Sequence, residues 1–139
     1  MKEPGGPPLP HLRDFLIADQ VFQQSGGKWC IIGVFDRVSA HRFPAVHHSL
    51  GLYLRLSDAR GDYDVRVEME DSSGRRLAKI EGIKLSTKDP LAEVGFGIQA
   101  HGLPLPAPGT YYFKLFFNDQ VFAEDIKLTA VEVPERSAE

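Results

Sequence analysis

Cysteine is nearly absent from this chain of 139 residues, because Cys30 is the only one. A single cysteine excludes a disulfide within the chain, so we expect the fold to depend on its apolar core. Apolar runs are short as well, and none approaches the roughly 20 residues of a membrane span. The first ten residues contain prolines and glycines where a secretory signal has an apolar stretch. These absences predict a cytoplasmic protein without membrane contact.

An excess of basic residues is also missing. Lysine and arginine total 16 against 19 acidic residues, and the formal net charge is −3. Proteins that bind nucleic acids or anionic membranes usually carry the opposite balance. The chain also has no catalytic motif and no cofactor fingerprint that we recognise. We therefore predict no nucleic-acid partner, no cofactor and no enzymatic activity.

The composition is that of one globular domain, with 42% hydrophobic and 25% charged residues. Its two ends differ from the rest. Residues 1–11 are rich in proline and glycine, and residues 134–139 are polar. Neither end contains enough apolar residues to be buried. We predict a flexible tail over 1–11, a folded domain over 12–133 and a second flexible tail over 134–139.

Apolar residues alternate with polar ones along much of the chain, which is typical of half-buried β-strands. The clearest run is 46–57, where His48 and four leucines share one face. Residues 63–70 and 93–100 alternate in the same way, and 75–85 changes phase at Gly82, as a β-bulge would. Residues 28–38 are apolar on both faces, which predicts a central strand. Residues 12–23 fit neither the helix nor the strand period, and we interpret them as the first strand.

The longest signal is a predicted hairpin over residues 108–133. Tyr111, Phe113, Leu115 and Phe117 occupy one face of its first strand, and Asn118-Asp119-Gln120 forms the turn. So large an apolar face needs a second sheet to cover it. With about eight short strands in all, the prediction is an all-β fold, a two-sheet antiparallel sandwich of the immunoglobulin-like kind.

Three residues lie on the other face of the same strand: Tyr112, Lys114 and Phe116. If that face is uncovered, the two rings form an apolar surface of the type found at protein interfaces. The alternative is that the proline-rich segment 102–109 covers them. These three residues are the predicted protein-interface site.

Two stretches resemble known proteins. GTYYFKLFF is similar to the strand entry of immunoglobulin-like sandwiches, in which a tyrosine corresponding to Tyr111 anchors a corner. The block GKWCIIGVFDRVSAHRFP, followed by a C-terminal G-x-Y-x-F hairpin, resembles a family of uncharacterised bacterial proteins of similar length. That resemblance implies a compact β-sandwich and no known activity, so it assigns no functional residue.

Reactive side chains are densest in segment 36–48, which contains Asp36, Arg37, Ser39, His41, Arg42, His47 and His48. Histidines and carboxylates are zinc ligands, but adjacent histidines on a strand point to opposite faces. A nucleophilic Cys30 paired with a histidine is a further hypothesis, although its apolar neighbours favour a buried thiol. No metal or catalytic residue is assigned.

The sequence therefore favours a non-enzymatic binding module whose partner is an unknown protein or a second copy of itself. The alternative is a metal-dependent enzyme or metal-binding protein that uses the segment Asp36 to His48. A third hypothesis, a carbohydrate or small-ligand receptor, requires aromatic residues that sequence alone does not bring together. Sandwich folds host many unrelated functions, so the fold does not decide among these hypotheses.

Overall fold

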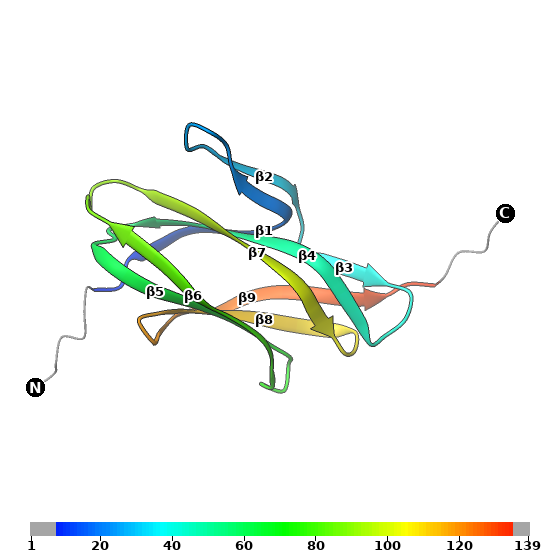
Figure 1. The fold of residues 1–139 in the computed structure, drawn as a ribbon. Helices are drawn as coiled ribbons and strands as arrows, with labels where there is room; N and C mark the ends of the chain where they lie inside the picture. Colours follow the sequence, from blue (N-terminus) through cyan, green and yellow to red (C-terminus); the bar gives the residue numbers. More distant parts are fainter. Residues whose placement is uncertain (1–7, 135–139) are drawn as a thin grey trace, which may run out of the picture.

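The computed structural model describes residues 8–134 and arranges them in two facing sheets (Figure 1). The first sheet has the order β2-β1-β4-β7 and consists of β1 (His11–Gln23), β2 (Trp29–Val34), β4 (Ala45–Ser57) and β7 (Val94–Leu105). The second has the order β3-β9-β8-β5-β6 and consists of β3 (Arg37–Ala40), β5 (Gly61–Glu70), β6 (Arg76–Thr87), β8 (Gly109–Phe117) and β9 (Gln120–Glu132). The predicted all-β sandwich is confirmed, with nine strands in place of eight. Neighbouring strands are antiparallel except β3 and β9, which are parallel.

The core lies between the sheets and follows the predicted alternation. Four leucines of β4 are completely buried: Leu50, Leu52, Leu54 and Leu56. They belong to one core with the buried residues of β5 and with the β8 row of Tyr111, Phe113, Leu115 and Phe117. Because one face of each central strand is buried in this core, its other face must point to the outside of the sandwich.

Part of the strand order is that of immunoglobulin-like domains. The order β9-β8-β5-β6 corresponds to strands G, F, C and C′ of the variable type. The tyrosine corner predicted at Tyr111 is also present. Its hydroxyl donates to the carbonyl oxygen of Ala107 at 2.5 Å and accepts from the Ala107 amide at 3.2 Å. These bonds hold the β7–β8 loop against the start of β8.

The prediction of one central strand over residues 28–38 is wrong. Those residues form β2 at the edge of the first sheet and the start of β3 in the second. Phe35 and Asp36 connect the two strands, and each anchors the connection. The Phe35 amide donates to the Ile17 carbonyl, and the Asp36 carbonyl accepts from the Thr129 amide. The prediction assumed that a strand with apolar residues on both faces is buried on both faces. In the structure only one face of β2 packs on the rest of the protein.

The hairpin formed by the second half of β1 and by β2 lies over the outer face of β4 and β7, above the sandwich in Figure 1. Gly51 and Gly97 create the space for it. A Cβ atom at Gly51 would lie 2.6 Å from Val21 Cγ2, and one at Gly97 would lie 2.9 Å from Trp29 Cζ3. Gln99 adds hydrogen bonds to the backbone of the hairpin, accepting from the Val21 amide and donating to the Asp19 carbonyl.

Two further predictions about β4 and β7 need correction. His48 is exposed, although the alternation placed it with the leucines. At the start of β4 the phase is opposite, because Ala45 packs on the core and the His47 ring lies 5.9 Å from that of Phe35. β7 also continues to Leu105, so part of the segment predicted as a proline-rich crossover is strand. By contrast, the bulge expected at Gly82 is present, with a register shift and a φ of 81°.

The boundary of the N-terminal tail also needs correction. Pro10 is buried, β1 begins at His11, and the Pro8 carbonyl accepts a 2.8 Å hydrogen bond from the Tyr63 hydroxyl. The folded domain therefore includes residues 8–11. Residues 1–7 and 135–139 of the predicted tails lie outside the described residues. In residues 8–134 no helix has the length and apolar character of a membrane span.

The first prediction tests the phase of β8. Phe113→Ala should lower the free energy of unfolding by about 3–5 kcal/mol, because it leaves a cavity between the sheets. Phe116→Ala should lower the free energy of unfolding by clearly less than Phe113→Ala does, because the Phe116 ring is on the outer face and only partly buried. Urea denaturation of both variants measures the difference. Equal losses would show that the two faces of β8 are assigned incorrectly.

The second prediction concerns the packing of the hairpin. Gly97→Ala should displace it, lower the melting temperature and shift the fluorescence of Trp29, the only tryptophan, to longer wavelength. Adding Val21→Ala should restore part of both signals, because it removes methyl groups that the new Cβ meets. A Gly97→Ala protein with the melting temperature and emission of the parent would contradict this packing.

Candidate functional site

The predicted interface residues lie on the outer face of the second sheet. Tyr112, Lys114 and Phe116 alternate along β8 with residues that are buried in the core. The predicted orientation of the strand is therefore correct. All three side chains are partly buried rather than fully exposed. Their function in an interface remains a prediction, which depends on what surrounds them.

Their neighbours come from β5 and β9. In the β5–β8 register Phe116 is opposite Arg66, Lys114 is opposite Glu68, and Tyr112 is opposite Glu70. In the β8–β9 register Val121, which is 47% exposed, is opposite Phe116. We call this group the outer patch, and its residues are Arg66, Glu68, Glu70, Tyr112, Lys114, Phe116 and Val121.

Arg66 is the central residue of the outer patch. Its guanidinium carbon lies 4.1 Å from the centre of the Phe116 ring, in a cation–π contact. Arg66 Nε donates to Glu68 Oε2 at 2.9 Å, and Nη1 donates to Asp119 Oδ1 at 2.5 Å. Hydrogen bonding to Asp119, and then to Glu68, raises the pKa of Arg66 above its ordinary value. Two carboxylates thus hold the guanidinium in place over the ring.

The other charges of the outer patch are also paired. Glu68 is the most buried charged residue of the described chain, and Arg76 approaches it at 3.4 Å in addition to Arg66. Lys114 Nζ lies 3.2 Å from Glu70 Oε2. A buried carboxylate is tolerated when donors compensate for its lost hydration. The patch is therefore a mixture of both signs around two aromatic rings.

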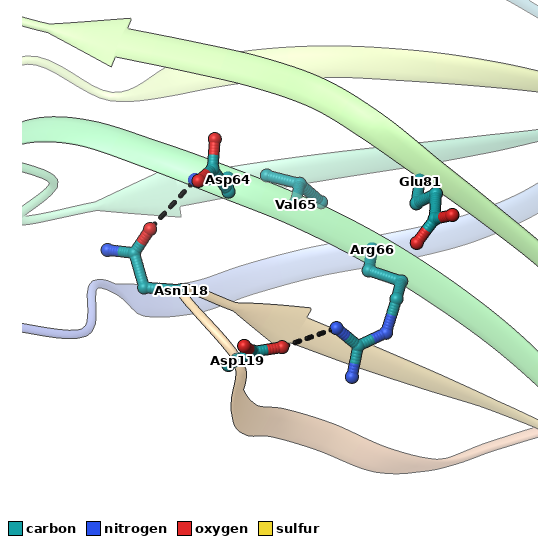
Figure 2. Close-up of a pocket in the computed structure, with 6 residues that line it drawn as sticks. All are labelled: Asp64, Val65, Arg66, Glu81, Asn118 and Asp119. Carbon is teal, nitrogen blue, oxygen red and sulfur yellow. Dashed lines mark hydrogen bonds and ion pairs between the residues drawn. The ribbon is translucent and has the colours of Figure 1, made fainter.

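The turn between β8 and β9 positions Asp119. Asn118 and Asp119 have φ values of 52° and 65°, the left-handed conformation that a two-residue hairpin turn requires. Asn118 bonds to the backbone of Asp64 through both its amide and its side-chain oxygen, each at 2.8 Å. Figure 2 shows the bond from the Asp64 amide to the Asn118 side-chain oxygen and the bond from Arg66 to Asp119. These residues line a pocket of about 170 Å³, with Glu81 on the neighbouring strand.

The alternative site, segment 36–48, is spread over the molecule. His41 Nδ1 lies 3.4 Å from the Val133 carbonyl oxygen, whereas the His47 ring contacts Phe35 and His48 is exposed. Within residues 8–134 no group of three or more histidine, cysteine or acidic side chains is close enough to hold a metal ion. The geometry therefore does not favour the metal hypothesis. Cys30 lies on β2, where its sulfur accepts a hydrogen bond from Gln24.

Sequence reasoning identified the β8 residues but missed Arg66, Glu68 and Asp119. The alternation along β5 predicted that Arg66 and Glu68 lie on the solvent side of the sheet. The structure places both on that outer face. Nothing in the sequence showed that β5 pairs with β8, so the stacking of Arg66 on Phe116 was not foreseen. The available signal was the Asn118-Asp119 turn, because a turn at the end of β8 lies near the end of the strand that pairs with β8, and Asp119 offers an acidic partner there.

Comparison with known proteins places the chain in a family. Residues 13–130 match a family of unknown function, DUF6941. The chain belongs to DUF6941. This agrees with the expected uncharacterised β-rich family, while a bacterial origin and the sequence motifs remain predictions. No curated protein matches the sequence.

Two solved structures are similar to this DUF6941 chain. The alkylpurine DNA glycosylase AlkC of Pseudomonas fluorescens, bound to DNA containing an abasic site analogue, has a TM-score of 0.55 at 9% identity. The match covers 89% of this chain and 30% of the glycosylase, so the chain spans less than a third of that enzyme. An immunoglobulin-like protein of Pseudomonas aeruginosa has a TM-score of 0.44 at 17% identity, covering 88% and 97% of the two chains. At 9% identity the likeness to the glycosylase shows the fold alone.

The third prediction tests the geometry around Arg66. Arg66→Lys keeps the charge but cannot donate to two carboxylates while stacking flat on Phe116. It should therefore lower the urea midpoint. Arg75→Lys, in the exposed β5–β6 turn, is the matched control and should leave the midpoint unchanged. If both variants unfold like the parent, the stack on Phe116 contributes nothing to stability.

Proposed function

We propose that this DUF6941 protein is a non-enzymatic binding module that takes a protein partner on its outer patch. The observation that carries the proposal is the Arg66–Phe116 stack, held by Glu68 and Asp119, with Tyr112 farther along the same face of β8. Tyrosine, phenylalanine and arginine are enriched at the centres of protein interfaces, where few residues supply most of the affinity. The patch presents all three on adjacent strands.

Preorganisation is the physical reason for choosing this surface. A long side chain that is free in solution loses rotamer entropy on binding, at a cost of about 0.5–1.5 kcal/mol. Arg66 is already fixed by two carboxylates, so little of that cost remains when a partner binds. A strand-borne surface is also more rigid than a loop, which favours a partner with a complementary folded surface.

The mixed charge of the patch indicates the chemistry of the partner. Within the patch Arg66 and Lys114 are balanced by Glu68 and Glu70. Two charged residues that contact it, Arg76 and Asp119, are also of opposite sign, so no single sign dominates. Such a surface suits a protein with alternating charges better than a polyanion, which needs a basic surface. No observation within residues 8–134 favours the alternative of a metal-dependent protein.

The fourth prediction tests this function by photo-crosslinking in the native host. A benzoylphenylalanine at Tyr112 should crosslink the partner, and adding Phe116→Asp should abolish the product because an added charge would be desolvated there. With purified partner, Phe116→Asp should weaken binding by at least about tenfold. The variant should keep the parent circular dichroism, because the new carboxylate lies beside Arg66.

Leu91→Asp is the matched control for this experiment. It makes the same apolar-to-acidic change at a loop residue that is 91% exposed. It should leave both the crosslink and the affinity unchanged. The proposal would be refuted if position 112 gave no product, or if Phe116→Asp folded normally and bound the partner as tightly as the parent.

A further inference from the structure

We draw no further inference here: the strongest candidate, the exposed apolar surface of the β1–β2 hairpin with Phe22, Ile32 and Val34, carries nothing because nothing in the structure shows what covers it.

Discussion

The packing of the β4 leucines and the β8 aromatic row into one core is the interaction on which the rest of the structure depends. A strand with one buried face cannot change register without moving its apolar residues to the outside. This packing therefore determines which side chains of β5 and β8 meet on the outer face. The contact of Arg66 with Phe116 is a consequence of it, because the register places the two residues directly opposite each other.

The first sheet shows a second constraint, which is the room that its outer face leaves for the β1–β2 hairpin. Gly51 and Gly97 remove side chains from the outer face of β4 and β7, and the hairpin fills the space with Val21 and Trp29. Side chains from one face of the hairpin thus cover the part of the sheet where the glycines have no side chains of their own. Its other face stays exposed and apolar, which is unusual unless a partner covers it.

The two sheets present surfaces of different chemistry. The outer patch combines aromatic rings with paired charges, whereas β2 offers an uncharged edge with unpaired backbone groups. The common sandwich fold leaves such surfaces free to differ among its many members.

Much of the fold was predictable because it follows from local pattern. The alternation in β4, β5 and β8 identified the buried faces, the Asn118-Asp119 turn closed the hairpin, and Tyr111 indicated the corner, all from residues near in sequence. The faces of Tyr112, Lys114 and Phe116 were predictable for the same reason. What the tertiary structure decided is the pairing of strands distant in the chain. Only pairing brings Arg66 to Phe116 and Asp119, sends β2 and β3 to different sheets, and exposes Ile32. Alternation states which residues share a face, but the choice of neighbouring strand depends on the packing of the whole core.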